Sequence, residues 1–283
     1  MTLNYRGRIA PSPTGYLHVG HAITFWHAQR RVREANGEMV LRIEDLDPQR
    51  CREEFTAAAL EDLKWFGLEW DEGLDVGGAF GPYVQSERRP LYLDAWRKLR
   101  DAGFVYPCRC SRKDVQQAAI APHDEDEEPI YPGTCRPRNP EQLIEAKRAD
   151  APGGVHWRFR IPDGEQLRFI DQHCGEQVAV AGRDFGDFVV WRKDDVPAYQ
   201  LAVVVDDVAM QITEVVRGQD LLTSTFRQLL LYRALGETAP RFYHTSLVLD
   251  ETGKRLAKRD AARSLRALRE GSVSPEEIRS RYL

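Results

Sequence analysis

Two histidines near the N-terminus have a spacing that suits phosphate chemistry. His18 and His21 flank Gly20 at the beginning of an expected helix, just after the turn-forming Pro-Thr-Gly at residues 13–15. A helix start offers unpaired N–H groups and positive potential to phosphates, and glycine lets a nucleotide approach the backbone closely. Two imidazoles can also donate hydrogen bonds to a phosphoryl group as its charge develops. Polar residues at a helix cap, or zinc ligands, have the same spacing, so the spacing alone leaves these alternatives open.

Charged side chains at the ends of expected strands form a second candidate group. Arg42 and Glu44 share one face of a strand because they are two residues apart. Glu44 ends that strand, where open α/β sheets bind ligands, and its carboxylate suits an ammonium group. The simpler alternative is a surface salt bridge. Arg217 follows an apolar strand, where its guanidinium suits a bidentate grip on a carboxylate. Tyr199 opens another expected strand and can donate its hydroxyl.

Three cysteines in the middle of the chain have a spacing that favours zinc. Cys108, Cys110 and Cys135 supply three thiols, whereas zinc usually takes four Cys or His ligands. His123 lies between them and is one candidate for the fourth ligand. The alternative is a set of free buried thiols, which the spacing makes less favourable.

Composition places the chain among ordinary globular proteins. It has 283 residues, which suggests roughly two domains, with 42% hydrophobic and 30% charged residues. A secretory signal is not expected, nor is an apolar run of about 18 residues, so a cytoplasmic location is expected. Five scattered cysteines argue against a disulfide framework, and Cys51 and Cys174 are expected to be packing residues. The net charge of −4 gives no support for nucleic-acid binding, and the basic segment at residues 254–269 is typical of a solvated helix face.

The first part of the chain predicts an α/β arrangement. Strands are expected at residues 8–10 and 39–43, with helices at residues 21–35 and 55–66, from their apolar patterns. Asn36-Gly37 is a plausible stop for the first helix. Strand, helix and strand within about 40 residues make a βαβ unit, which implies a parallel sheet covered on both faces.

The rest of the chain predicts an insertion followed by more of the sheet. Residues 106–128 are polar and irregular and end in an acidic run, which is typical of a solvated loop. Alternating apolar residues at 155–170 predict antiparallel strands. Further strands are expected at residues 187–191, 201–205, 212–216 and 245–249, and the continuously apolar 201–205 suits a strand buried on both faces. This order predicts a nucleotide-binding fold split by an inserted module.

Several strings together carry a resemblance to a known family. Residues 11–21, Pro-Ser-Pro-Thr-Gly-Tyr-Leu-His-Val-Gly-His, resemble the HIGH motif of class I aminoacyl-tRNA synthetases in its glutamyl form. Residues 41–48, 198–207 and 216–221 also resemble that family. The resemblance implies a Rossmann-like parallel sheet split by an inserted zinc-containing α+β module, with a short C-terminal helical segment. It implies four segments: residues 1–90, the first half of the nucleotide-binding fold; 91–184, the insert; 185–240, the second half; and 241–283, a KMSKS-like loop with C-terminal helices.

The same resemblance implies a glutamate site. Its lining residues would be Arg8, Ala10, Ser12, Glu44, Tyr199 and Arg217. Arg8 and Arg217, with Tyr199, would bind the side-chain carboxylate. Glu44 and Ser12 would bind the amino group. Charged recognition of this kind excludes glutamine, because the amide would leave an arginine unpaired.

ATP and zinc sites are implied in the same way. ATP would be bound by His18, Gly20, His21, Arg255 and Lys258. Residues 252–259 correspond to the KMSKS loop, in which Arg255 replaces the first lysine, Ala257 replaces the central serine and Lys258 is retained. Without the family these residues are simply a basic loop. The family's zinc module has Cys-x-Cys followed by Tyr-x-x-x-Cys, which makes Tyr131 the fourth ligand beside Cys108, Cys110 and Cys135.

The length of the chain suggests which members of the family it resembles. The sequence ends 25 residues after Lys258, which leaves no room for helical anticodon-binding domains. This short form and the Tyr-Pro-Gly-Thr-Cys string are similar to bacterial members that esterify the queuosine base of tRNA(Asp). The expected substrates are therefore L-glutamate, ATP with Mg²⁺, and queuosine-containing tRNA(Asp), with one structural Zn²⁺ and no membrane or obligate protein partner. The alternatives are a truncated glutamyl-tRNA synthetase that charges tRNA(Glu), a non-catalytic tRNA-binding relative, and a class I nucleotidyltransferase with another substrate.

Overall fold

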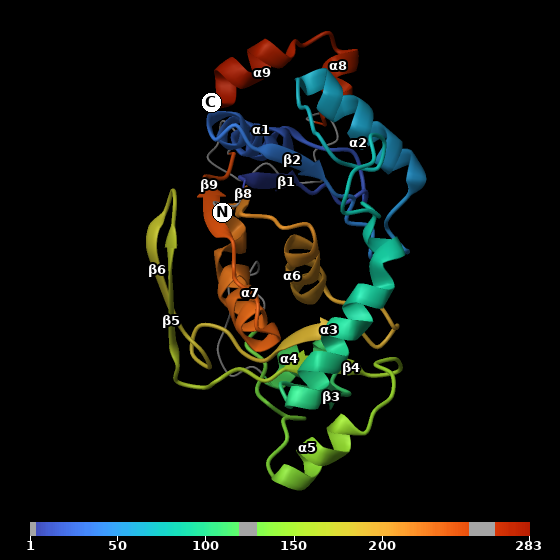
Figure 1. The fold of residues 1–283 in the computed structure, drawn as a ribbon, viewed down its shortest axis with the longest axis vertical. Coiled ribbons are helices and arrows are strands. Elements are labelled where there is room, and N and C mark those ends of the chain that lie inside the picture. The colour runs from blue at the N-terminus through green and yellow to red at the C-terminus, as the bar shows by residue number, and fades with distance from the viewer. Residues whose placement is uncertain (1–3, 119–128, 249–263) are drawn as a thin grey trace.

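The chain folds into an elongated molecule with the N-terminal elements at one end and α5 at the other (Figure 1). The computed structural model describes residues 4–118, 129–248 and 264–283. Within these ranges, no helix is long and apolar enough to cross a membrane.

The expected βαβ unit opens the fold. β1 (Arg6–Ile9) and β2 (Glu38–Leu41) pair in parallel, and α1 (Val19–Glu34) connects them. The helix ends where Asn36 takes a left-handed conformation and Gly37 follows. A Cβ on Gly37 would lie only 2.3 Å from the Tyr5 carbonyl oxygen, so the predicted stop requires a glycine there. α2 (Glu53–Phe66) follows, as the sequence predicts, and ends at the left-handed Gly67.

Two more parallel strands extend this region. β8 (Glu214–Gly218) and β9 (Arg241–Thr245) pair in parallel and are connected by η2 (Gln219–Leu221) and α7 (Leu222–Leu235). β8 lies beside β1, because the Thr213 amide donates to the Arg6 carbonyl at 2.9 Å. A hairpin of β5 (Gln166–Asp171) and β6 (Gly175–Val180) adds to the other edge of β9, in the order β6-β5-β9-β8.

The inserted module begins after η1 (Gln85–Arg88) and contains a separate antiparallel sheet. Its strands are β3 (Val105–Cys108), β4 (His156–Phe159) and β7 (Phe188–Trp191), in the order β3-β4-β7. Its helices are α3 (Arg89–Ala102), α4 (Arg112–Ala118) and α5 (Pro140–Lys147). The predicted antiparallel strands at residues 155–170 are confirmed as β4 and all but the last residue of β5, which pairs antiparallel with β6.

Three of the late strand predictions need correction. Residues 201–205 belong to a helix, α6 (Tyr199–Ala209). Because this helix is buried on several sides, its apolar residues are consecutive and show no helical periodicity, so the sequence pattern does not distinguish it from a buried strand. The strand predicted at residues 245–249 is β9 and ends at Thr245. The strand at residues 187–191 is β7, but it pairs antiparallel with β4 instead of joining the parallel strands.

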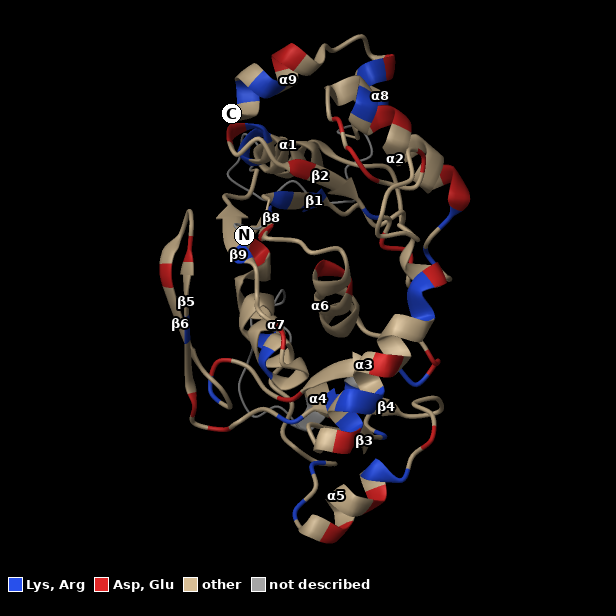
Figure 2. Ribbon diagram, in the orientation of Figure 1, with Lys and Arg blue, Asp and Glu red and all other residues tan. Residues whose placement is uncertain are grey.

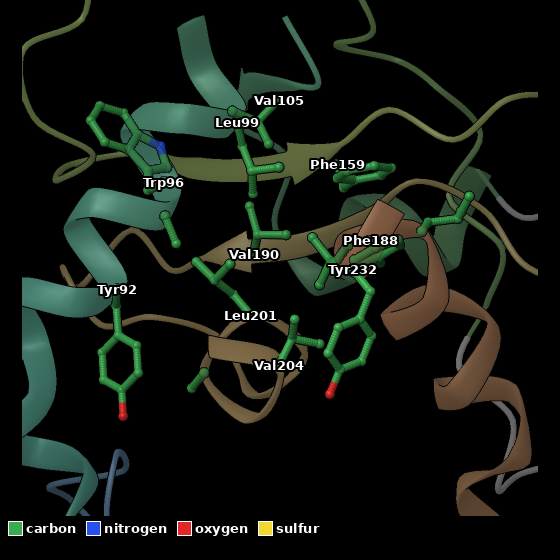
Figure 3. Packing of buried hydrophobic residues seen from close by; sticks show 14 of the residues in the cluster. Tyr92, Trp96, Leu99, Val105, Phe159, Phe188, Val190, Leu201, Val204 and Tyr232 are labelled. Carbon is green, nitrogen blue, oxygen red and sulfur yellow. The ribbon is translucent and has the colours of Figure 1, made fainter. Parts of the chain in front are cut away.

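The main apolar core holds α6 in place. Leu201 and Val204 of α6 pack among side chains of α3, β4, β7 and α7 (Figure 3). Trp96 of α3 meets Trp157 of β4 edge to face, with ring centroids 5.0 Å apart. This core fixes the start of α6, and therefore Tyr199, relative to the parallel strands.

The expected C-terminal helices cover the N-terminal end of the fold. α8 (Leu265–Glu270) and α9 (Pro275–Tyr282) bury Leu265 and Ile278 against α1 and α2. Arg279 also donates to the Phe66 carbonyl at the end of α2, at 2.6 Å. Acidic residues predominate on α2 and basic residues on α8 (Figure 2), and Arg266 of α8 lies 2.7 Å from Glu61 of α2.

Candidate active site and metal cluster

One open cavity collects the predicted ligand-binding residues. It has a volume of about 400 Å³ and lies at the carboxyl ends of β1 and β8, beside the starts of α1 and α6. The predicted residues that line it are Arg8, Ala10, Ser12, His18, Gly20, His21, Glu44, Tyr199 and Arg217. Arg255 and Lys258 lie outside the described residues, as does the rest of the KMSKS-like loop. The two described neighbours of that segment, Val248 and Ser264, lie at this site: Val248 lines the cavity and Ser264 forms a β-bridge with His18.

The two histidines meet at the first turn of α1. Their rings stack with centroids 3.8 Å apart, and the His18 backbone amide donates to Nδ1 of His21 at 3.4 Å. Since Nδ1 accepts, a neutral His21 carries its proton on Nε2. A Cβ at Gly20 would approach the His18 ring to 3.0 Å, so the glycine makes room for that ring. The arrangement can present an N–H donor beside a helix N-terminus.

Glu44 is held by a buried arginine. Arg42 is fully buried and donates to Glu44 at 3.1 Å and to Asp207 of α6 at 2.7 Å. The shared face predicted for Arg42 and Glu44 is therefore confirmed, but Arg42 is fully buried and Glu44 is only slightly exposed, so the pair is not a surface salt bridge. Burial raises the pKa of Glu44, while the guanidinium groups of Arg42 and Arg8 oppose this rise. A positively charged group bound beside Glu44 would lower this pKa by Coulombic attraction.

A second buried carboxylate, Asp206, stabilises the same region. It accepts from Gln85 at 2.7 Å, from Nε of Arg88 at 2.6 Å and from the Tyr92 hydroxyl at 2.9 Å. Asp206 also lies 3.7 Å from Nε of Arg42. These donors satisfy a charge that is fully buried, so α6 is tied to β2 and to the start of the inserted module.

Arg217 projects from the end of β8 into the cavity. Its guanidinium contacts the Tyr199 hydroxyl at 3.4 Å, donates to Thr225 of α7 at 2.7 Å, and donates from Nε to Nε2 of His244 at 3.1 Å. Tyr199 is the first residue of α6, and not the beginning of a strand, because residues 199–209 are helical. Its placement beside Arg217 nevertheless brings the predicted pair together.

Arg8 approaches the same cavity from β1. It donates to the Val216 carbonyl at 3.0 Å, and its Nε lies 3.5 Å from Asp207. Arg8 and Arg217 are almost fully buried, at 5% and 4% exposure, and both line the cavity. Two guanidinium groups and Glu44 therefore give one cavity the charges that suit an amino acid with an acidic side chain.

The three predicted zinc cysteines come together in the inserted module. The sulfur atoms of Cys108, Cys110 and Cys135 lie within 4.8 Å of one another, and the Tyr131 oxygen is 3.4 Å from Cys108 and 3.7 Å from Cys110. Tetrahedral ligands around zinc are separated by about 3.5–3.8 Å. The three thiols therefore suit a metal ion such as zinc, the Tyr131 hydroxyl lies beside them, and His123 lies outside the described residues.

The surroundings of this cluster act differently on its thiols, because burial raises the pKa of Cys110 to about 11. Nε of Arg158 donates to the Cys108 sulfur at 3.3 Å, and its guanidinium lies over the Tyr131 ring at 3.8 Å. Burial opposes ionisation of Cys135, but hydrogen bonds from the Arg109 backbone and Tyr131 lower its pKa to about 7. Of these donors, Arg158 and the Arg109 backbone lie outside the four candidate ligands and support a negatively charged sulfur.

Several site residues are invisible to motif reasoning. Asp206 and Asp207 lie in a string that resembles the family, but their buried ion pairs require α6 to be a helix. His244 and Asp171 carry no motif signal, and only the pairing of β5 with β9 brings them together. The cavity is further lined by Thr24, Phe25, Asp220, Leu221, Ser246 and Leu247. Of these, Thr24 and Phe25 lie on the predicted helix one turn after His21, which is the only sequence signal for them.

Comparison with known proteins agrees with this fold and site. The family described as "tRNA synthetases class I (E and Q), catalytic domain" matches residues 4–281. A solved glutamate tRNA ligase from Elizabethkingia meningosepticum, in complex with its amino acid, superimposes with a TM-score of 0.75 and 31% identity. That likeness covers 91% of this chain and 52% of the ligase chain. The molecule is therefore a class I synthetase catalytic unit of the glutamate and glutamine group.

The curated relatives define the group more narrowly. Glutamyl-Q tRNA(Asp) synthetase of Symbiobacterium thermophilum is 50% identical over 96% of this chain and 83% of the relative. The enzyme of the same name from Nitratidesulfovibrio vulgaris is 47% identical over the same shares. A glutamate–tRNA ligase from Nitrosococcus oceani is 41% identical, but only 57% of its length is covered. The chain belongs to the glutamyl-Q tRNA(Asp) synthetase family.

Proposed function

We propose that this protein activates L-glutamate with ATP and transfers the glutamyl group to the queuosine base of tRNA(Asp). The observation that carries the proposal is the shared cavity, in which Arg8, Arg217 and Glu44 line the same space as His18 and His21. The charged residues that suit an acidic amino acid thus lie beside a helix start that suits phosphate. Membership of the family supports the choice of tRNA(Asp) over tRNA(Glu).

The glutamate pose follows from the charges. Arg8 and Arg217 bind the side-chain carboxylate, and the Tyr199 hydroxyl adds a neutral donor beside Arg217. Glu44 and Ser12 bind the ammonium group, while Ala10 leaves space between these two sets. In this pose the α-carboxylate lies toward His18 and His21, where the ATP phosphates are expected.

The first reaction is attack of the α-carboxylate on the α-phosphate of ATP. The bond to the phosphate forms as the bond to pyrophosphate breaks, giving glutamyl-adenylate. His18 and His21 donate to the phosphate oxygens, and Gly20 lets them approach α1. Arg255 and Lys258 of the KMSKS-like loop neutralise the leaving pyrophosphate, which carries Mg²⁺.

The second reaction moves the glutamyl group to the tRNA. A hydroxyl of the queuosine cyclopentene attacks the adenylate carbonyl, the bond to AMP breaks, and the adenylate phosphate takes the proton. Zinc bound by Cys108, Cys110, Tyr131 and Cys135 has a structural role in the inserted module. We further propose that the segments 1–90, 91–184, 185–240 and 241–283 are the units in which these functions are organised.

The test is pyrophosphate exchange followed by glutamate transfer. Exchange of labelled pyrophosphate into ATP is measured with glutamate, glutamine or aspartate and without tRNA. Labelled glutamate is then offered with queuosine-containing tRNA(Asp), with tRNA(Asp) lacking queuosine, and with tRNA(Glu). Glutamate-dependent exchange and label on queuosine-containing tRNA(Asp) alone are expected. Label on tRNA(Glu) alone favours a charging enzyme instead, and no exchange or transfer favours a binding protein.

The role of Lys258 has its own test. Lys258→Ala is expected to abolish exchange, because the pyrophosphate loses its main counter-charge. Lys193→Ala is the matched control, since Lys193 is exposed in the turn after β7. Near-normal exchange in Lys258→Ala contradicts the assignment.

A further inference from the structure

Arg217 has a supporting pair that no motif indicates. We propose that His244 and Asp171 are positioning residues that orient the Arg217 guanidinium toward the glutamate side chain and leave its positive charge available to that ligand. The inference rests on the proposed role of Arg217 in binding glutamate.

The three residues form a continuous buried chain of contacts. Asp171 Oδ2 lies 2.6 Å from Nδ1 of His244, and Nε2 of His244 accepts from Nε of Arg217 at 3.1 Å. Exposure is 2% for Asp171, 0% for His244 and 4% for Arg217. Water therefore does not compete for these contacts.

The protonation pattern follows from the partners. Asp171 is a carboxylate, so Nδ1 of His244 must carry the proton to donate to it. Neutral His244 then has a lone pair on Nε2, and that lone pair suits the Nε–H of Arg217. Thr225 adds its hydroxyl at 3.1 Å from Nε2 and also accepts from Arg217. The guanidinium is thus fixed along its Nε edge.

A neutral partner preserves the charge of Arg217. Arg8 and Arg42 both lie near the carboxylate of Asp207. In contrast, the described side-chain hydrogen bonds of Arg217 go to the uncharged His244, Tyr199 and Thr225. An arginine without a buried carboxylate partner binds a ligand carboxylate more strongly than one already neutralised. His244 therefore orients the Arg217 guanidinium without neutralising its positive charge.

Asp171 is held away from Arg217 by its own hydrogen bonds. It accepts from the backbone amides of His173 and Cys174 at 2.9 and 2.8 Å, and from the His244 amide at 3.2 Å. These donors occupy the carboxylate at the end of β5, where Asp171 pairs with Phe242. The imidazole is the only described side chain through which Asp171 reaches Arg217.

Two substitutions at His244 separate orientation from packing. In His244→Gln, the side-chain amide reaches the position of Nε2 and can still accept from Arg217. In His244→Asn, the shorter amide keeps the contact with Asp171 and loses the contact with Arg217. Loss of a hydrogen bond to a charged group changes an equilibrium by roughly 10–100-fold. His244→Asn is therefore expected to raise the KM for glutamate on the order of 10–100-fold, with a smaller rise in His244→Gln.

The measurement is pyrophosphate exchange with glutamate, ATP and glutamine each varied. Both variants are expected to keep the KM for ATP, and His244→Asn is expected to lose discrimination against glutamine. A purely structural role predicts equal losses in both variants, or a milder loss in His244→Asn, and either result overturns the inference. Melting temperatures show whether each variant is folded.

Asp171→Asn is the second test and does not alter His244 itself. The introduced asparagine side chain has an NH₂ group in place of one carboxylate oxygen, and this group cannot accept from the backbone amides or from His244. The His244 imidazole therefore loses the acceptor that fixes its orientation. The expected result is again a higher KM for glutamate with an unchanged KM for ATP. Glu176→Gln, an exposed position on β6, is the matched control and is expected to behave as the wild type. A normal KM for glutamate in Asp171→Asn overturns the role of Asp171.

Calorimetric titration of glutamate separates this inference from the proposed function. Wild-type protein that binds glutamate without exchange contradicts the proposed reaction, and the positioning role is then decided by the binding constants of the variants. Wild-type protein that does not bind glutamate overturns both.

Discussion

At the scale of single residues, the two cavity arginines, Arg217 and Arg8, are held in position by different kinds of partner. Arg8 lies 3.5 Å from a carboxylate of α6, whereas Arg217 is held by an imidazole and two hydroxyl groups. Arg217 therefore retains more charge for the ligand. The planar guanidinium group also forms two parallel hydrogen bonds with a carboxylate, which the ammonium group of a lysine does not.

Arg217→Lys tests that geometry. The expected result is a fall of roughly 100-fold in kcat/KM for glutamate, because lysine keeps the charge but loses the bidentate fork and the contact with His244. Pyrophosphate exchange measures the loss. Arg183→Lys, at an exposed position, serves as the control and is expected to leave the exchange unchanged. Exchange at the wild-type level in Arg217→Lys would show that charge alone is enough.

The pH dependence of stability depends on His244. Burial lowers its pKa to about 4, and Arg217 and Arg8 act in the same direction while Asp171 opposes them. As pH falls, His244 is therefore protonated in the unfolded chain before it is protonated in the folded protein. Its contribution to the free energy of unfolding is complete above about pH 6.5 and is lost as pH falls toward 4. The contribution is about 3 kcal/mol.

Urea unfolding of wild type and His244→Gln between pH 4 and pH 7.5 checks this expectation. The wild type is expected to lose more stability on acidification, because Gln has no proton to gain. NMR titration of the His244 ring checks the pKa directly. Parallel pH profiles of the two proteins would contradict the assignment to His244.

Motif strings predicted the lining of the cavity well at this scale. His18, Gly20 and His21 follow one another in one turn of helix, so local sequence fixes their relation. Asp171 and His244 are separated by 73 residues, and their contact depends on the pairing of β5 with β9. That pairing has no signature in either strand, so the sequence alone does not show the support behind Arg217.

At the scale of secondary-structure elements, α6 positions one of the residues that line the cavity. Its first residue is Tyr199, and two turns later Asp206 and Asp207 contact Arg42, which follows β2, and arginines of η1 and β1. The strand prediction for residues 201–205 failed because four consecutive buried apolar residues fit either geometry. Residues 206 and 207 decide the matter, since a helix places both carboxylates among the buried arginines.

Asp206→Asn tests how strongly this network supports α6. The substitution leaves Arg42 and Arg88 buried beside a neutral amide, which is expected to cost about 3–5 kcal/mol in the free energy of unfolding. Urea denaturation gives the value. Asp194→Asn, in the exposed turn after β7, is expected to change it by less than about 0.5 kcal/mol. Equal stability of the two variants would show that Asp206 is replaceable.

At the scale of the whole molecule, the sequence predicted the order of the parts better than their pairing. The βαβ beginning and the antiparallel insert lie where the patterns place them, and the C-terminal helices lie where the family resemblance places them. However, β7 joins the insert sheet, and the β5–β6 hairpin joins the parallel strands. Strand partners depend on long-range packing, which local periodicity does not encode.

The metal cluster is tested on the intact chain. Mass spectrometry under native conditions is expected to find one zinc per chain in the wild type and none in Cys110→Ser, because the ligand set loses a thiolate. Thermal unfolding of Cys110→Ser is expected at a lower temperature. Cys51→Ser, outside the cluster, is expected to keep both the zinc and the wild-type melting temperature. Zinc retained at full occupancy in Cys110→Ser would exclude these ligands.

The β5–β6 hairpin limits how this protein can be recombined. Its residues fall within the predicted insert, residues 91–184, yet Asp171 forms part of the proposed support behind Arg217. A chimera that exchanges the whole of residues 91–184 for the corresponding piece of a relative also exchanges that support. Grafts that cut before residue 166 keep Asp171 with its native partners His244 and Arg217, so a junction that preserves these contacts lies inside the insert and not at its end.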